Sequence, residues 1–268
     1  MAHIPGIVLA FLVCSAAMPA QQTSTKDPDS QESSPAAEAR GPERATSPKL
    51  LIPNIFHDQK AIWTFPLTAA KGRHWKSVFG VTLATAALVV ADPYTEPYFR
   101  NNSGFNAYKT GPLRGRNTTL AITLTPVAFY LTGLAKHSRH AQNTALLAAE
   151  GIADTQILSF VMKHIAGRLT PGYIPPNGNF RDTWFKYKGS FTNAGSFPSG
   201  HAASAFAVAT VIADRYRQHR WIPWVCYGAA AFAALTRVPD QAHFPSDVFM
   251  GAALGYSISH FVVLHARN

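Results

Sequence analysis

Six segments rich in Ala, Leu and Val, separated by stretches where Gly and Pro gather, run through most of the 268-residue chain. No sustained alternation of apolar and polar residues is bounded by turn signals, which argues against a sheet. The pattern therefore predicts an all-α protein, a helical bundle of about six core helices. We expect helices at Ser77–Ala91, Thr118–Ala135, Gln142–His164, Ser199–Ala213, Trp221–Thr236 and Asp247–Leu264, with a short segment at Asp58–Trp63 packed before them.

The apolar segments fall slightly short of the roughly 20 residues that a membrane-spanning helix needs. Charged residues make up 14% of the chain, well below the usual quarter or so of a globular protein. Glu150 and Asp154, in the third segment, are costly in lipid unless they face the interior of a bundle. Both a membrane bundle and a soluble helical bundle are compatible with this pattern.

The first 49 residues differ in composition from the rest. A short apolar run at Ile4–Ala17, followed by small residues, predicts a signal peptide or an N-terminal anchor at residues 1–20. Residues 21–49 are rich in Ser, Pro, Ala and Glu and contain no large apolar side chain, so they predict a disordered linker. The folded domain is then expected at residues 50–268.

The chain carries a formal net charge of +10. A basic balance of this size indicates an anionic partner, which can be nucleic acid, an anionic membrane or an anionic substrate. No nucleic-acid-binding motif is present, so we expect no nucleic-acid partner.

The two cysteines, Cys14 and Cys226, lie far apart, which excludes a C-x-x-C metal or redox site. We therefore expect no metal and no cofactor, and Cys226 as a buried small hydrophobic residue.

Three short stretches of polar residues lie at the ends of the predicted helices. The first runs from Lys163 to Pro171 at the end of the third helix, and the second is Phe197–His201 at the start of the fourth. The third extends from Thr236 to Asp247, between the fifth and sixth helices. An up-and-down bundle places all three on the same side, so we expect them to form one site.

Each stretch offers groups suited to holding phosphate. Ser199 is a good N-cap, and Gly200 allows the backbone to approach a ligand closely. The unpaired N–H groups and the positive dipole end of that helix favour an anion. Lys163, Arg168 and Arg237 supply fixed positive charge for the phosphate oxygens.

His243 and Asp247 are four residues apart. If the sixth helix starts near Pro245, a carboxylate beside the imidazole fixes its tautomer and leaves the other ring nitrogen as a nucleophile. His201 then remains to protonate the departing oxygen. Two histidines, one carboxylate and several cations form a complete set for phosphoryl transfer without a metal.

Together the stretches resemble the signature of the type 2 phosphatidic acid phosphatase (PAP2) family, whose fold is shared with vanadium haloperoxidases and bacterial class A acid phosphatases. The family pattern is K-x6-R-P, then P-S-G-H, then S-R-x5-H-x3-D. The second motif is intact, and the third matches with Thr236 in place of Ser. In the first motif Lys163 and Pro171 fit, but Thr170 occupies the arginine position.

A threonine hydroxyl cannot provide a charged, bidentate phosphate contact. Arg168, two residues earlier, is the expected substitute, with Thr170 as a weak contact. The resemblance implies a PAP2/haloperoxidase-like bundle in which His243 attacks phosphorus, Asp247 orients it, and His201 acts first as acid and then as base. It also implies a phosphate cradle made of Lys163, Arg168, Ser199, Gly200 and Arg237.

The function expected from this resemblance is a metal-independent phosphatase acting on a phosphate monoester or diphosphate, with a lipid phosphate as the expected partner. One alternative is a soluble periplasmic acid phosphatase of broad specificity. Another is a vanadate-dependent haloperoxidase, because the same cradle holds vanadate. A non-catalytic phospholipid-binding module, suggested by Thr170, is the third.

Six aromatic residues between Gly172 and Phe197 form either a mouth for lipid or a pinned surface loop.

Basic residues gather at the end of the predicted bundle opposite the three motifs. If the helices span a membrane, this end is cytoplasmic by the positive-inside tendency, and the site faces the periplasmic side. Six spans then place the segment before Ser77 inside, whereas a cleaved signal peptide places it outside. An uncleaved anchor, a first helix that does not span, or a soluble periplasmic domain would each resolve this conflict. The basic residues are Lys136, Arg139, Arg215, Arg217, Arg220 and Arg267.

Overall fold

The structure is a computed structural model, which describes residues 44–72, 74–106, 108, 111, 114–187 and 195–265. The expected signal peptide or anchor at residues 1–20 and most of the expected linker at residues 21–49 lie outside the described residues. Within them every regular element is a helix. The all-α prediction is therefore confirmed for this part of the chain.

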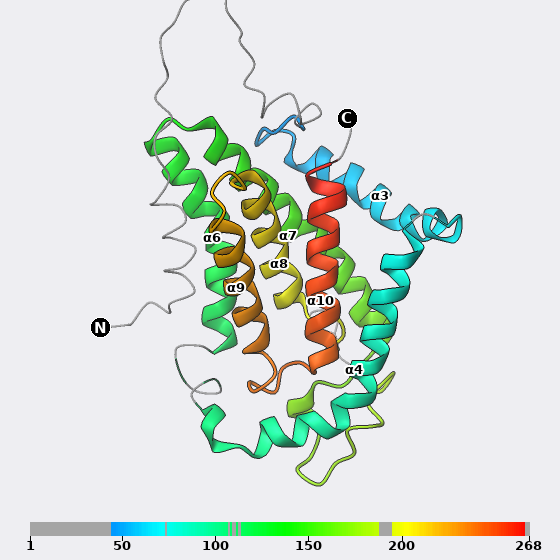
Figure 1. The fold of residues 1–268 in the computed structure, drawn as a ribbon. Coiled ribbons are helices and arrows are strands. Elements are labelled where there is room, and N and C mark those ends of the chain that lie inside the picture. Colours follow the sequence, from blue (N-terminus) through cyan, green and yellow to red (C-terminus); the bar gives the residue numbers. More distant parts are fainter. Residues whose placement is uncertain are drawn as a thin grey trace, which may run out of the picture.

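The main helices form an elongated bundle with α8 at its centre (Figure 1). Short helical turns, η1 (Ser103–Phe105) and η2 (Pro171–Tyr173), lie in two of the connections, and a π-helical turn, η3 (Ile258–Val263), continues the last helix. The main helices are α3 (Leu51–Ala70), α4 (Trp75–Asn101), α6 (Gly115–Ala135), α7 (Arg139–Ala166), α8 (Gly200–Arg215), α9 (Ile222–Leu235) and α10 (Pro245–Ser257).

The six predicted core helices are all present, but two N-terminal elements are longer than predicted. The segment expected at Asp58–Trp63 is the whole of α3, and α4 continues past Ala91 to Asn101 through two prolines. Proline in a helix interior removes a backbone hydrogen bond. Tertiary contacts compensate here, because Asp92 and Glu96 in the extension are completely buried and hydrogen-bonded to distant residues.

Small residues bring α8 and α10 into backbone contact. Five alanines of α8 are completely buried. A Cβ atom added to Gly251 or Gly255 of α10 would lie 2.3 Å from the Ser199 carbonyl oxygen or 2.1 Å from that of Ala203. Only glycine allows this approach, so the two helices are held at a fixed separation and register.

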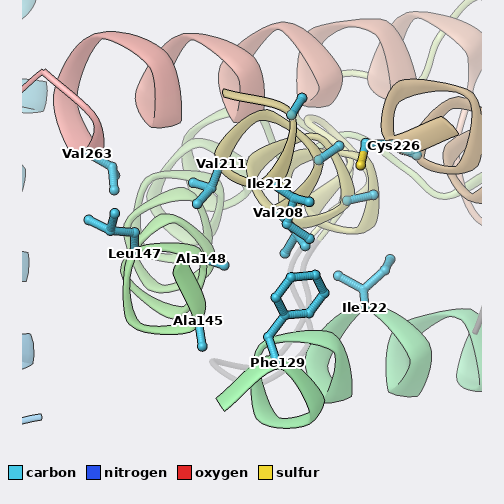
Figure 2. Close-up of a cluster of buried hydrophobic side chains, with 14 of the residues drawn as sticks. Ile122, Phe129, Ala145, Leu147, Ala148, Val208, Val211, Ile212, Cys226 and Val263 are labelled. Carbon is cyan, nitrogen blue, oxygen red and sulfur yellow. The ribbon is translucent and has the colours of Figure 1, made fainter. Parts of the chain in front are cut away.

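Larger apolar side chains fill the space between α8 and its other neighbours. Figure 2 shows Phe129 of α6 directed toward Val208 and Ile212 of α8, with Cys226 of α9 in the same cluster. Cys226 is completely buried and is a free thiol, as expected for a small hydrophobic residue. The core thus extends from α6 through α8 to α9 and α10.

The outer surface of the bundle is strongly apolar. In the part of the chain that the structure describes, three stretches are long and apolar enough to cross a membrane by length and composition: α4, α6, and Arg139–Tyr173, which contains α7. Glu150 and Asp154 of α7 face the interior and are completely buried, as expected for acids in such a helix. This is the surface of a membrane-associated protein. Large exposed side chains on α4 and α6 include Val78, Phe79, Leu83, Val90, Leu120, Leu124, Val127 and Leu131.

Candidate active site

The three polar stretches meet at one end of the bundle, where α8 and α10 begin and α7 ends (Figure 1). The ring centroids of His201 and His243 are 6.2 Å apart. The backbone N–H of Ser199 donates to the carbonyl oxygen of Asp247 over 2.9 Å, which joins the second and third stretches directly. The predicted convergence is therefore present in the structure.

The N-terminus of α8 has the predicted cap. The Ser199 hydroxyl accepts from the Ala202 N–H over 3.3 Å, and helix α8 begins at Gly200. Gln156 of α7, which the motif analysis did not identify, donates to the Gly200 carbonyl over 2.8 Å and to the Ser204 hydroxyl over 2.7 Å. The start of α8 is thus fixed from two sides, which sets the position of His201.

His243 lies in the loop before α10 and is 5% exposed. Its backbone N–H donates to the Arg237 carbonyl over 3.2 Å. Its Nδ1 atom is 3.7 Å from Oδ2 of Asp247, which is an electrostatic contact longer than a hydrogen bond. The Asp247 carboxylate also accepts from the Phe244 N–H over 2.9 Å. Because Nδ1 is on the carboxylate side, Nε2 is the ring nitrogen left for chemistry.

Arg168 is only 1% exposed and bridges two carboxylates. It donates to Asp247 and to Asp92 over 2.6 Å each, and to the Ser246 hydroxyl over 2.7 Å. Its guanidinium carbon also lies 4.0 Å from the ring centroid of Phe244. The guanidinium expected to hold phosphate is therefore engaged with acids, and its contacts support the carboxylate beside His243.

Asp92 was not identified from the sequence. It lies in the α4 extension, and besides Arg168 it accepts from both the N–H and the hydroxyl of Ser246. The only signal in the sequence is an acid in an otherwise apolar helix, which indicates a partner without naming it. The structure thus connects α4 to the start of α10 through Asp92 and Arg168.

Two further cations lie in the site. Lys163 donates to the Gly195 carbonyl over 3.0 Å, and Arg237 forms an ion pair of 2.5 Å with Asp240. Gly115, at the start of α6, lies directly against Arg237, because a Cβ atom on it would come within 1.5 Å of the guanidinium. Lys163 and Arg237 therefore remain the charged candidates for binding phosphate oxygens.

The start of α6 contributes a second residue that the motifs did not indicate. The Thr119 hydroxyl contacts Nε2 of His201. Thr119 and Gly115 are one helical turn apart, so α6 covers both His201 and Arg237. Neither residue belongs to a recognisable spacing with the three motifs, because they come from a different helix.

Electrostatics favour a neutral His243. Burial, with added repulsion from Lys163 and Arg237, lowers its pKa to about 4. Burial and the positive charge of Arg237 likewise hold the pKa of His201 well below its ordinary value. Although burial raises the pKa of Asp247, the His243 ring and Arg168 together hold it below its ordinary value. Near pH 7 the site thus contains an ionised Asp247 beside a neutral imidazole.

The aromatic residues before α8 divide between two roles. Trp184 stacks on Arg168 at 4.6 Å, and Phe180 packs against Phe244, so both support the buried part of the site. By contrast, Phe185 is 77% exposed, and Tyr173, also exposed, stacks on Tyr187. Trp184 and Phe180 thus pin the loop, whereas a lipid mouth formed by Tyr173 and Phe185 stays a prediction, and Phe191 lies outside the described part of the chain.

Residues 144–268 match the family model of the PAP2 superfamily. This part of the chain is a PAP2 superfamily domain. It contains all three stretches of the site. Helices α4 and α6 precede residue 144, so they lie outside the matched region, although Asp92 of α4 is bonded to Arg168 within it.

Curated relatives of this PAP2 domain are lipid A phosphatases. A lipid A 1-phosphatase of Porphyromonas gingivalis is 35% identical over 91 residues, covering 34% of this chain and 18% of that protein. The lipid A 1-phosphatase of Rhizobium etli is 35% identical over 103 residues, covering 37% and 40%. A lipid A 4'-phosphatase of P. gingivalis is 27% identical over 127 residues, covering 46% and 52%. The chain thus spans about half or less of the length of these relatives.

Among solved structures, the chain is similar to a transmembrane PAP2-type phosphatidylglycerolphosphate phosphatase from Bacillus subtilis. The TM-score is 0.44 and the sequence identity 21%. The similarity covers 77% of this chain and 94% of that chain.

Proposed function

We propose that the protein is a phosphatase that hydrolyses a phosphate ester of a membrane lipid through a phosphohistidine at His243. The observation that carries the proposal is the meeting of His243 and His201, with Asp247 behind the first, beside Arg237 and Lys163. A nucleophile held by a carboxylate, a second histidine and two cations are the groups that phosphoryl transfer needs.

The proposed reaction has two steps. Nε2 of neutral His243 attacks phosphorus, forming a P–N bond while the bond to the lipid oxygen breaks and His201 gives its proton to that oxygen. Water then attacks the phosphohistidine, His201 takes the proton of the water, and the P–N bond breaks to release phosphate. Asp247 stabilises the positive charge that His243 carries in the intermediate.

His201 must be protonated for the first step, although its pKa is held low by burial and by Arg237. A bound phosphate dianion supplies the missing negative charge, because an anion near an imidazole favours the protonated form. The substrate thus helps to charge its own general acid. Lys163, Arg237 and the N-terminus of α8 would contact the phosphate oxygens, with Thr170 as a weak neighbour.

A lipid substrate is supported by the apolar surface of the helices that cover the site and by the lipid A phosphatases among the relatives. Lipid A is therefore the first candidate. The site would face the periplasmic side, because Lys136 and Arg139 lie at the other end of the bundle, where α6 ends and α7 begins (Figure 1).

The test is phosphate release by the full chain in detergent micelles, with EDTA present, from lipid A, phosphatidate and a soluble aryl phosphate. We expect release from a lipid substrate to fall by about three orders of magnitude or more in His243→Asn. His57→Asn is the matched control, because His57 is exposed on α3 at the other end of the bundle. Undiminished activity in His243→Asn would reject the proposal.

The intermediate has its own test. Loss of the acid–base group in His201→Asn should slow the second step, while an aryl phosphate, whose leaving group depends little on an acid, can still complete the first. A brief incubation with an aryl phosphate radiolabelled in the phosphate should therefore label the protein. The label should be stable to base and labile to acid, as a phosphoramidate is, and absent from His243→Asn. Preference for the aryl phosphate over every lipid would instead favour the acid phosphatase of broad specificity.

A further inference from the structure

Helix α3 exposes most of its large apolar side chains, whereas two of its three buried residues are polar. Its buried residues are Asn54, Asp58 and Ile62. Phe56 is 74% exposed, and Ile52 and Leu67 are also largely exposed. A helix on the surface of a soluble protein has the opposite arrangement.

The residues of α3 sort into three faces at the helical step of about 100° per residue. Ile52, Phe56, Trp63 and Leu67 fall within about 60° of arc and form the apolar face. The face bearing Asn54 and Asp58 is turned to the protein. Between the two lies a third face that is polar and exposed, with His57, Lys60, Thr64 and Thr68.

Polar contacts attach the inner face of α3 to the bundle. Asn54 donates to Glu150 over 2.8 Å, and Gln59 donates to Asp154 over 2.9 Å. Arg44 donates to Asp58 over 2.7 Å from the segment before the helix. These contacts fix the rotation of α3 about its own axis, so the apolar face is held outward by the fold.

The outward face is continuous with other apolar surface. Helix α3 packs on α7, α4 and η3, and Figure 1 shows it lying across the bundle near the C-terminus of the chain. The next helix, α4, is one of the candidate membrane spans and exposes Phe79 and Leu83. Trp63 and Trp75 are both partly exposed, and Lys71 and Lys76 lie in and after the turn between the helices. Tryptophan and lysine gather where lipid meets water.

From this arrangement we propose that α3 lies in the plane of the membrane, at the boundary opposite the active site, with Ile52, Phe56, Trp63 and Leu67 among phospholipid acyl chains. The exposed polar face, which carries Lys60, meets the headgroups and water. The occupant of the apolar face is bilayer lipid, because that face continues the lipid-facing surface of α4 and is bordered by cations. The assignment does not depend on the proposed phosphatase activity.

The test measures the depth of single spin labels on α3. Phe56→Cys and Lys60→Cys are made in the full chain carrying Cys14→Ser and Cys226→Ala, labelled with a nitroxide and placed in phosphatidylcholine–phosphatidylglycerol nanodiscs. We expect the label at 56 to collide with dissolved oxygen and to be several-fold less accessible than the label at 60 to a water-soluble nickel chelate. Both side chains are exposed, so neither substitution removes a buried contact.

Two further sites calibrate the result. Phe79→Cys on α4 gives the value for a lipid-facing position, and Lys186→Cys, in an exposed ion pair, gives the value for water. Equal nickel accessibility at positions 56 and 60 would overturn the proposal, because α3 would then lie in water. Low accessibility to both reagents at position 56 would also overturn it, because a second protein copy would then cover the face.

Discussion

Two buried clusters of charged residues, one at each end of the molecule, are built in opposite ways. The site cluster contains Asp92, Arg168, Ser246 and Asp247, and the far cluster contains Arg44, Asp58, Glu150 and Asp154. In the site cluster the guanidinium makes a close contact to each of two carboxylates and to a hydroxyl. Each acid therefore has a fixed partner.

The far cluster has three acids and a single arginine, Arg44, which forms ion pairs with Asp58 and Glu150. Within the described residues, four of its buried atoms have no hydrogen-bond partner: Arg44 Nε, Asp58 Oδ1, Glu150 Oε2 and Asp154 Oδ2. A buried polar group without a partner costs free energy. The comparison shows complete pairing around the carboxylate that lies beside His243, and incomplete pairing where α3 is attached to the bundle. The two clusters should therefore respond differently to substitution.

The largest effect is expected from Arg168→Met, which leaves Asp92 and Asp247 buried without their cation. Breaking a buried pair in this way costs about 3–5 kcal/mol of stability. We also expect turnover to be lost, because Asp247 would no longer be positioned behind His243. Thermal unfolding in detergent and phosphate release measure the two losses.

The milder variant Arg168→Lys tests whether Arg168 positions Asp247 or binds the phosphate itself. If Arg168 acts only through Asp247, kcat falls in the folded protein while the inhibition constant for inorganic phosphate stays unchanged. Arg237→Lys is the matched comparison, because Arg237 is expected to touch the phosphate and its loss should weaken inhibition. Weakened phosphate inhibition in Arg168→Lys would return Arg168 to the phosphate cradle.

Substitutions in the far cluster are expected to have intermediate effects on stability. One of them should destabilise the protein, and the other should be neutral or stabilising. Arg44→Met should cost about 1–3 kcal/mol, because Asp58 loses its hydrogen-bonded partner, while the activity of the folded protein stays unchanged. Asp154→Asn should be neutral or stabilising by up to about 1 kcal/mol, because the amide offers the N–H donors that the unpaired acids lack. Thermal unfolding of both variants is the measurement.

The same aspartate-to-asparagine change in the site cluster provides the contrast. Asp247→Asn should destabilise the protein and abolish turnover, because the amide N–H groups would oppose the donors of Arg168 and Phe244. If Asp154→Asn and Asp247→Asn destabilised the protein equally, the distinction between the clusters would be wrong.

The smallest effect is expected from Asp240→Asn, which removes the carboxylate paired with Arg237. The uncompensated positive charge should lower the already depressed pKa of His201 further. Because His201 must be protonated to act as the acid, the descending limb of the kcat/KM profile should move to lower pH, by about one unit or less. The profile of Asp182→Asn, which breaks an exposed pair, should match that of the unmodified protein. A shift to higher pH would contradict this assignment of the acid.

The sequence was sufficient to predict the core helices and the meeting of His201, His243 and Asp247, because each motif has a fixed spacing at a helix end. It could not predict the partners of Arg168, since Asp92 lies 76 positions earlier on another helix. Pairing between distant helices has no spacing rule. Gly115 and Thr119 were missed for the same reason.

The extent of α3 was missed for a different reason. Pro53 lies in the first turn of α3, where a proline costs no hydrogen bond, and Pro66 lies close to the end, so neither proline stops the helix. Phe56 faces outward because Asn54 binds Glu150 and Asp58 binds Arg44 on the opposite face of α3. These partners are visible only in the folded structure. Amphipathic spacing alone indicates two faces and does not say which is turned inward.

The backbone contact between α8 and α10 has a consequence for how the sequence of this protein can change over evolution. Main-chain atoms form the hydrogen bond from Ser199 to Asp247 and the contacts of Gly251 and Gly255. Substitutions of side chains elsewhere therefore leave these contacts intact. Side chains are less constrained at the exposed aromatic residues Tyr173 and Phe185. If the protein is the proposed lipid phosphatase, a new headgroup is most easily accommodated by replacing those aromatic residues around an unaltered pair of histidines.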